Sequence, residues 1–255
     1  MAKILAIHAH PDDIETLAAG TLALLAAKGH TIRIVTATAG EGGSSTLPAD
    51  EIGSIRKAEA AKAAALIGAD YRCAGLPDLG VFNDDWGRRT LTEIIRWAAP
   101  DIVLAPSPED YHPDHEAVSL LVRDASFAAS VPNYQTGPAA ALADIPHLYF
   151  IDAIGGRGRT GAHIVADFGV EVTAFMATKR AMLAAHASQN AWVARQHDIA
   201  DPLADMEAWT AHRGRDFGAP FAEGFRHYRH HPYPRRSWLQ ELVGEALLRV
   251  TPPPT

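Results

Sequence analysis

The chain has 255 residues, 47% of them hydrophobic and 21% charged, which is typical of a globular protein with one large α/β domain or two small ones. Its single cysteine, Cys73, excludes an internal disulfide and a zinc site built from thiolates, and it fits a reducing compartment. A formal net charge of −7 without a basic stripe argues against a nucleic-acid partner. No apolar run approaches the ~18 residues that span a bilayer, and the N-terminal run is too short for a secretion signal, so we expect a cytoplasmic protein with no membrane partner.

The first half of the chain alternates apolar runs rich in β-branched residues with helical patterns. This alternation predicts a parallel sheet covered by helices on both faces. We expect Gly29 and Gly68 to end the first two helices and Asp50 to cap the second. The predicted strands are 4–7, 32–38, 71–74 and 102–105, and the predicted helices are 14–28, 50–67, 90–99 and 113–129.

The second half is harder to interpret, and no change in composition marks a second domain. We expect a single domain over residues 1–255, with a frayed tail after about residue 249. The predicted elements of this half are strands at 147–151 and 164–168, a helix at 171–187 and a terminal helix at 237–248.

Two segments contain the sequence His-Pro-Asp, at 10–12 and at 112–114. Composition alone predicts roughly 0.06 occurrences in this chain, so two are well above chance. Each segment follows a buried apolar strand and begins a helix. Because ligands of parallel sheets bind beyond the carboxyl ends of the strands, both segments are expected at one edge of the sheet.

Metal chemistry explains this composition, because a catalytic zinc takes three His or carboxylate ligands and keeps a position open for water. His10 and Asp13 are three residues apart across a strand-to-helix turn and can converge on one ion. Either His112 or His115 can complete the set, and the other imidazole is then left beside the metal. Asp12 lies between two ligands, where its carboxylate can take a proton from the bound water.

The two segments resemble the LmbE/PIG-L family of zinc deacetylases, which remove acetyl groups from N-acetylglucosaminyl substrates. Further segments that resemble the family are 38–41, 55–59, 75–78, 186–189 and 213–218, so the likeness covers most of residues 4–230. The segment 108–115 is most similar to the branch that deacetylates N-acetylglucosaminyl malate in bacillithiol biosynthesis.

The resemblance implies a role for each matching residue. It makes His10, Asp13 and His115 the metal ligands and Asp12 the general base. His112 would stabilise the oxyanion or protonate the leaving amine, with Asp114 orienting it. The positions of Arg56 and Asp78 match residues that bind sugar hydroxyls. Where some relatives have a tyrosine two residues before His112, this chain has Asp110, and Tyr111 is adjacent.

Other candidates have weaker support. The glycine-rich segment 40–43 lacks the lysine of a nucleotide-binding loop and is interpreted as a rim loop. His8 is expected on the opposite side of the sheet end from His10. The cluster of His227, His230 and His231 is interpreted as solvated surface, with a second metal site or a subunit contact as alternatives.

We therefore expect a Rossmann-like, mostly parallel α/β domain without a nucleotide cofactor. The expected activity is zinc-dependent removal of an N-acetyl group from an N-acetylglucosaminyl conjugate. The conjugate could also be a chitin fragment, an antibiotic or a thiol conjugate. A two-His, one-carboxylate set also suits Fe²⁺, so a non-haem iron enzyme is one alternative. Others are a metallophosphoesterase and a metal-binding protein without turnover. Relatives tend to be oligomers, which implies a homo-oligomer.

Overall fold

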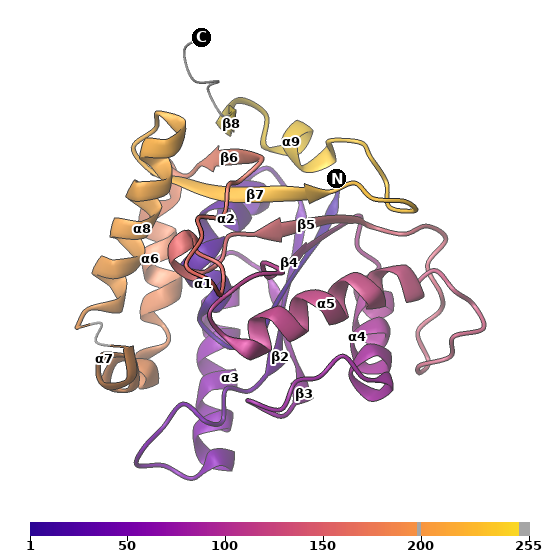
Figure 1. Ribbon diagram of the computed structural model, residues 1–255, viewed down its shortest axis with the longest axis horizontal. Coiled ribbons are helices and arrows are strands. Elements are labelled where there is room, and N and C mark those ends of the chain that lie inside the picture. The colour runs from indigo at the N-terminus through magenta and orange to yellow at the C-terminus, as the bar shows by residue number, and fades with distance from the viewer. Residues whose placement is uncertain (198–199, 250–255) are drawn as a thin grey trace.

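A mixed eight-stranded sheet with helices on both faces forms the protein (Figure 1). The computed structural model describes residues 1–197 and 200–249, so the expected frayed tail lies outside the described residues. The strands are β1 (Lys3–His8), β2 (Thr31–Thr38), β3 (Asp70–Leu76), β4 (Ile102–Ala105), β5 (His147–Ile151), β6 (Phe168–Glu171), β7 (Ala222–Tyr228) and β8 (Leu247–Arg249). The α-helices are α1 (Asp13–Leu17), α2 (Ala19–Ala27), α3 (Ala49–Ala65), α4 (Asp85–Ala98), α5 (Pro113–Ala128), α6 (Met176–Ala184), α7 (Asn190–His197), α8 (Pro202–Phe217) and α9 (Trp238–Val243). Short 3₁₀ turns lie at Ile154–Gly156, Thr173–Phe175, Ala187–Gln189 and Gly244–Ala246.

The strand order is β3-β2-β1-β4-β5-β7-β6-β8. The first five strands in this order pair in parallel, and β7, β6 and β8 extend the sheet with antiparallel pairs. The order runs outward from β1 through β2 to β3 on one side, and from β4 to β5 on the other. The switch point of this topology therefore lies between β1 and β4, where open α/β sheets bind their ligands. The expectation of a mostly parallel α/β fold is confirmed.

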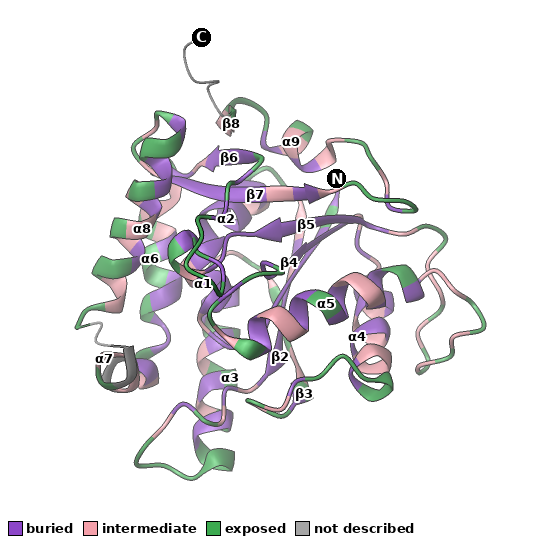
Figure 2. Ribbon diagram, viewed as in Figure 1, coloured by how far each residue is buried: buried purple, intermediate pink, exposed green. Residues whose placement is uncertain are grey.

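Alternation along the strands builds a core on each face of the sheet. Ile4 and Ala6 of β1 belong to one buried cluster, and Leu5 and Ile7 belong to the other. Side chains two residues apart point to the same face of a strand, so both faces of this central strand are apolar. Figure 2 shows the central strands as buried along most of their length.

Several boundaries of the first half differ from the expectation. The single helix predicted at 14–28 is divided into α1 and α2, because the backbone at Ala18 leaves the helical region (φ −139°). Asp50 does not cap α3 but lies in its first turn, since the cap position is Pro48. Helix α4 begins five residues earlier than predicted, with the Asp84 carboxylate accepting a hydrogen bond from the Gly87 amide.

The second half departs further from the prediction. The expected strand at 164–168 meets β6 only at Phe168. The helix expected at 171–187 is shorter and starts with a 3₁₀ turn, and the terminal helix stops at Val243. Helices α7 and α8 and strands β7 and β8 were not predicted.

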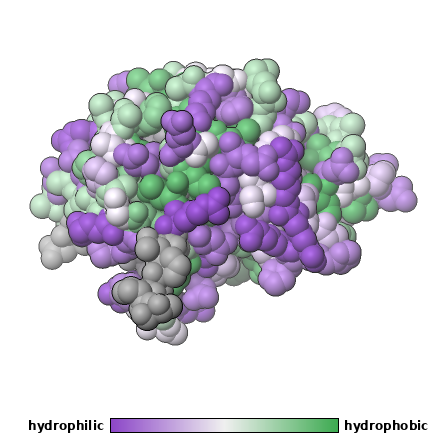
Figure 3. All heavy atoms as spheres, turned by 90° about the horizontal axis from the view of Figure 1, so that it is seen from above, coloured by the Kyte–Doolittle hydropathy of each residue, from purple (hydrophilic) through white to green (hydrophobic). Residues whose placement is uncertain are grey.

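Within the described part of the chain, every helix is too short or too polar to cross a bilayer. Figure 3 views the molecule from the side of β8 and α9, and on this face hydrophobic groups are interrupted by hydrophilic ones.

A buried ion pair joins the antiparallel part of the sheet to the helices over it. The Lys179 ammonium on α6 donates to Glu223 of β7 at 2.6 Å, and both side chains are about 1% exposed. The same carboxylate accepts the amides of Gly20 and Thr21 at the start of α2. A carboxylate is favourable at a helix N-terminus, so Glu223 connects three elements.

Replacing Glu223 by alanine should leave the Lys179 ammonium buried without its partner. We expect the free energy of unfolding, measured by urea denaturation, to fall by about 3–5 kcal/mol. The control is Glu241→Ala, which removes an exposed ion pair with Arg236 and should change the stability little. Equal stability of the two variants would contradict the structural role of Glu223.

Candidate active site

The first cluster lies at the turn between β1 and α1, directly beyond the buried strand. Asp12 has a φ of +93°, a left-handed conformation that is uncommon for a residue other than glycine and is often found at functional sites. The amide and hydroxyl of Thr16 both donate to the Asp12 carbonyl oxygen, at 3.0 and 2.9 Å, and hold this backbone in place. The turn brings His10 and Asp13 together, with the His10 amide donating to Asp13 Oδ2 at 2.8 Å.

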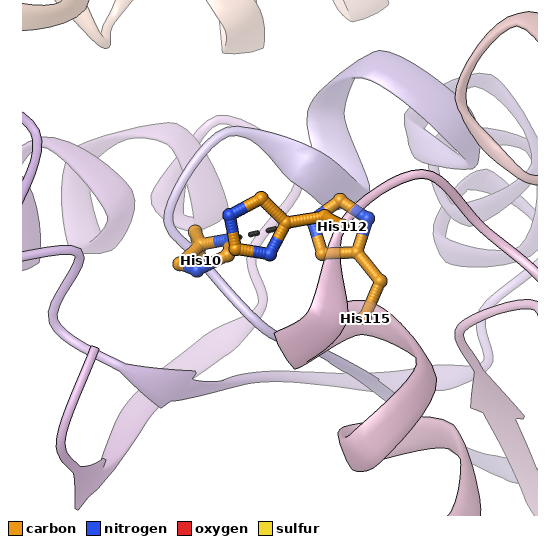
Figure 4. A group of neighbouring side chains, drawn as sticks. All are labelled: His10, His112 and His115. Carbon is orange, nitrogen blue, oxygen red and sulfur yellow. Dashed lines mark hydrogen bonds between the residues drawn. The ribbon is translucent and has the colours of Figure 1, made fainter. Parts of the chain in front are cut away.

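The second cluster begins α5, after β4. His112 occupies the cap position, and Pro113 follows as the first helical residue, where its missing N–H costs no hydrogen bond. His115 lies one turn further on and is buried. Because β4 pairs in parallel with β1, the two clusters meet at the same edge of the sheet, as predicted. Figure 4 shows the imidazoles of His10, His112 and His115 gathered together.

Three atoms from the two clusters form a nearly equilateral triangle. His10 Nδ1 is 3.3 Å from Asp13 Oδ2, His115 Nε2 is 3.4 Å from the same oxygen, and the two nitrogens are 3.3 Å apart. Ligand atoms bound to Zn²⁺ at about 2.0–2.1 Å in a tetrahedron lie about 3.3–3.4 Å apart. The triangle therefore fits one face of a tetrahedral zinc site.

Other combinations of these side chains could also share an ion. In the part of the chain that the structure describes, each such group of His and acidic residues draws on the same region. The groups are His10 with His112 and His115, His8 with Asp13 and His115, and His10 with Asp78 and Asp114. The three histidines alone would lack a carboxylate, whereas the triangle with Asp13 provides one negative charge against a divalent cation.

The candidate ligands are oriented by further polar side chains. Asp78 Oδ1 lies 3.1 Å and Asp114 Oδ2 3.4 Å from Nε2 of His10, the ring nitrogen opposite the triangle. Asp110 Oδ1 lies 3.1 Å from Nδ1 of His115 in the same way. Such carboxylate–histidine contacts fix the tautomer and orientation of metal-binding imidazoles.

Electrostatics at the cluster favours a cation. Burial alone would lower the pKa of His10, but hydrogen bonds with Asp114, Asp13 and Asp78 raise it well above its usual value. Burial would raise the pKa of Asp13, but His115 and His8 hold it well below its usual range. The carboxylates therefore stabilise positive charge at this place, and a divalent ion can supply that charge instead of protons.

Asp12 lies beside the triangle and is held by Arg56. Arg56 Nη2 is 3.2 Å from Asp12 Oδ2 and donates to the Pro11 carbonyl at 2.7 Å, while Nη1 donates to the Gly40 carbonyl at 2.8 Å. Glycines are required at 40 and 43, since a Cβ at either would come within 2.5 Å of the guanidinium. Burial raises the pKa of the Asp12 carboxyl, against the opposing effect of Arg56. A carboxylate with a raised pKa is a better proton acceptor for catalysis.

His112 presents a hydrogen-bond donor. Its Nδ1 accepts the Asp114 amide at 3.2 Å, so a neutral ring carries its proton on Nε2. Burial and the neighbouring His10 and His115 lower the pKa of His112, which favours that neutral form. Asp114 therefore orients His112 through its backbone amide, while its carboxylate contacts His10 and the Leu79 amide.

All eight site residues expected from the sequence lie in one region. A cavity of about 630 Å³ is lined by seven of them and several apolar side chains, a volume within the ~300–1,000 Å³ common for ligand pockets. The seven that line it are His10, Asp12, Asp13, Arg56, Asp78, His112 and His115. The eighth, Asp114, lies behind His10. Arg56 and Asp78 contact the protein's own groups here, and their binding to sugar hydroxyls stays a prediction.

Two residues of the site were missed or misplaced by the sequence analysis. The expectation that His8 lies away from His10 is wrong: its Nδ1 is 2.6 Å from Asp13 Oδ2, and its ring packs edge-on against His115 at 4.7 Å. Asp110 is buried behind His115 and also accepts the amides of His112 and Ile154. Its position two residues before His112 was the one signal that could have identified it.

The interpretation of His227, His230 and His231 as solvated surface is wrong for His227, and the candidate metal groups of the described residues include none of the three. His227 is buried, with its ring stacked on Tyr149 at 4.2 Å, whereas His230 and His231 are exposed. Tyr111 is 52% exposed at the cavity, with its ring 5.7 Å from those of His112 and His115.

Comparison with known proteins identifies the family. Residues 5–126 match the family model "PIG-L: GlcNAc-PI de-N-acetylase". A protein of Nakamurella multipartita named 1D-myo-inositol 2-acetamido-2-deoxy-alpha-D-glucopyranoside deacetylase is 32% identical over 234 residues, which cover 74% of this chain and 80% of that protein.

Two solved structures share the fold. The conserved protein TT1542 of Thermus thermophilus has a TM-score of 0.73 at 27% identity, over 92% of this chain and 100% of that one. GalB, the 4-carboxy-2-hydroxymuconate hydratase of Pseudomonas putida KT2440, has a TM-score of 0.73 at 21% identity, over 93% and 98%. The second likeness shows the fold alone, and the family rests on the matched motifs and the similarity in sequence. The chain belongs to the PIG-L family of de-N-acetylases and is a hydrolase.

Proposed function

We propose that this protein is a zinc-dependent hydrolase that removes the N-acetyl group from an N-acetylglucosaminyl conjugate. The observation that supports this most is the triangle of His10, Asp13 and His115 with the Asp12 carboxylate beside it. In this proposal the three residues of the triangle hold the metal, which polarises the amide carbonyl and lowers the pKa of water when it is bound.

The chain's own residues supply the proton transfers. Asp12 accepts a proton from the attacking water as the new C–O bond forms at the acetyl carbon. Arg56 occupies Oδ2 of Asp12, so we assign this proton to Oδ1. The Nε2–H of His112 donates a hydrogen bond to the oxygen on which negative charge develops. Asp12 then returns its proton to the nitrogen as the C–N bond breaks, which releases acetate and the free amine.

The identity of the group attached to the sugar distinguishes the possible substrates. The similarity of segment 108–115 suggests malate, as in bacillithiol biosynthesis. The relative from Nakamurella multipartita is named for an inositol conjugate, and this supports inositol more than malate. Arg56 and Asp78 are proposed to contact sugar hydroxyls at the cavity wall. A cytoplasmic location and a homo-oligomer are kept as proposals, the latter testable by light scattering.

Metal binding tests the ligand set. Chelator-treated protein titrated with Zn²⁺ should bind one ion per chain. Asp13→Ala and His115→Ala should weaken binding by at least about 100-fold, because each removes an inner ligand and even outer partners are worth about 10- to 100-fold. His230→Ala, which alters an exposed histidine, should bind as the parent chain does. Unchanged affinity in Asp13→Ala would exclude this ligand set, and the same titration with Fe²⁺ compares the two metals.

Asp12→Asn tests the general base at constant size, because asparagine also tolerates the left-handed backbone. We expect metal binding to be retained and kcat for acetate release to fall by about 10²–10⁴-fold. Acetate is measured with the inositol and malate conjugates and with methyl N-acetylglucosaminide as substrates. Asp144→Asn, at an exposed loop carboxylate, is the control. Full activity of Asp12→Asn would contradict the assignment.

A further inference from the structure

The cavity is lined by two chemically different sets of side chains. One set contains the imidazoles and carboxylates of the candidate active site. The other set, the apolar wall, comes from α6, the 3₁₀ turn at Ile154–Gly156, α7 and the start of α8. These are Ile154, Leu183, Trp192, Val193, Pro202 and Leu203. All six are buried or half-buried, so they form a wall rather than a scatter of exposed groups.

The charged side chains of the cavity offer little to an anion at the apolar wall. Among the described residues that line the cavity, Arg56 is the one Lys or Arg side chain. Its charge is already paired with the Asp12 carboxylate, and its terminal nitrogens also donate to the carbonyl oxygens of Gly40 and Pro11. Among the described lining residues, Asp205 is the carboxylate that lies close in sequence to the apolar wall, at the start of α8.

The wall lies beside the candidate active site, because α6 and α8 both contact α1, the helix that begins at Asp13. Leu183 on α6 is close in sequence to His186, and both line the cavity with Asp12 and Arg56. For a sugar whose acetamide lies at the triangle, this wall is the apolar surface that the same cavity offers to the attached group. Apolar surface of the substrate that is buried against this wall would stabilise binding.

We propose that the group attached to the sugar is uncharged and presents an apolar face, such as an aryl or alkyl group, that packs on Trp192 and Leu203. This inference rests on the proposed function and names the class of its substrate. It disfavours the malate conjugate, whose carboxylates would meet Asp205 and, among the described residues that line the cavity, no Lys or Arg other than Arg56. A polyol such as inositol is uncharged but offers less apolar surface to this wall.

The experiment compares glycosides of N-acetylglucosamine that differ only in the attached group. Methyl, phenyl, inositol and malate conjugates are given to zinc-loaded protein, and kcat/KM is measured from acetate release. We expect the phenyl glycoside to exceed the methyl glycoside by about tenfold or more, because an additional ring is buried. The malate conjugate should be the poorest substrate. A malate or inositol conjugate that exceeds the phenyl glycoside would overturn the inference.

Two variants locate the effect. Trp192→Ala should lower kcat/KM for the phenyl glycoside about tenfold and leave the methyl glycoside within about twofold. Trp86→Ala, an exposed tryptophan on α4 outside the cavity, is the matched control. Leu203→Arg supplies the missing cation and should raise the ratio of malate to phenyl turnover. The assignment of the wall would be contradicted if Trp192→Ala left the ratio of phenyl to methyl turnover unchanged and Leu203→Arg left the ratio of malate to phenyl turnover unchanged.

Failure of the inference can be told from failure of the proposed function. Acetate from all four glycosides at equal kcat/KM would keep the deacetylase and exclude the apolar preference. If no acetate is released, the proposed function fails, and calorimetric titration of the metal-free protein with the phenyl and malate conjugates still decides the preference. Tighter binding of the phenyl glycoside, lost in Trp192→Ala, would support the wall, and tighter binding of malate would exclude it.

Discussion

The parallel pairing of β1 with β4 is the constraint on which the site depends. Ile4 to Ala6 pair with Ile102 to Leu104, which places the two strand ends side by side. After β1 the chain builds β2 and β3 on one side of this strand, and β4 then pairs with its other side. The connections that follow β1 and β4 therefore diverge, and a crevice opens between them. Each of the two turns then contributes polar side chains to this crevice. The first gives two candidate ligands and the carboxylate of Asp12, whose backbone is left-handed, and the second gives the imidazole at the cap of α5 and the buried imidazole of His115.

Charge compensation explains why so many polar groups tolerate burial there. Isolated carboxylates and imidazoles are costly to remove from water, but here each has a partner of opposite character. Asp78 and Asp114 contact His10, Asp110 contacts His115, and His8 contacts Asp13. GalB shares this fold although it is named a hydratase, so the fold alone does not determine the reaction. The arrangement of these side chains carries the functional argument.

The sequence was sufficient to predict strands and the position of the site where apolar runs and motifs coincide. The apolar runs that became β1, β2 and β4 were evident, and two strand ends with the same motif predicted a common edge. Helix α8 was missed because its buried positions include Thr210, Arg213 and Gly214, which do not read as an apolar stripe. The position of His8 was predicted wrongly because the alternation of side chains along a strand takes no account of other elements. Asp13, at the start of the next helix, contacts the His8 ring. Contacts of this kind depend on tertiary packing and are not visible in local sequence.

The candidate ligands come from two segments 105 residues apart at their nearest contact, His10 and His115. An ion bound by both segments would cross-link them at the switch point of the sheet. It would bind the folded chain and not the dispersed ligands, so it would add to the stability of the native state in proportion to the logarithm of its free concentration. The free energy of unfolding and the catalytic activity of this protein would then depend on the same metal ion, and the free concentration of that metal would limit both.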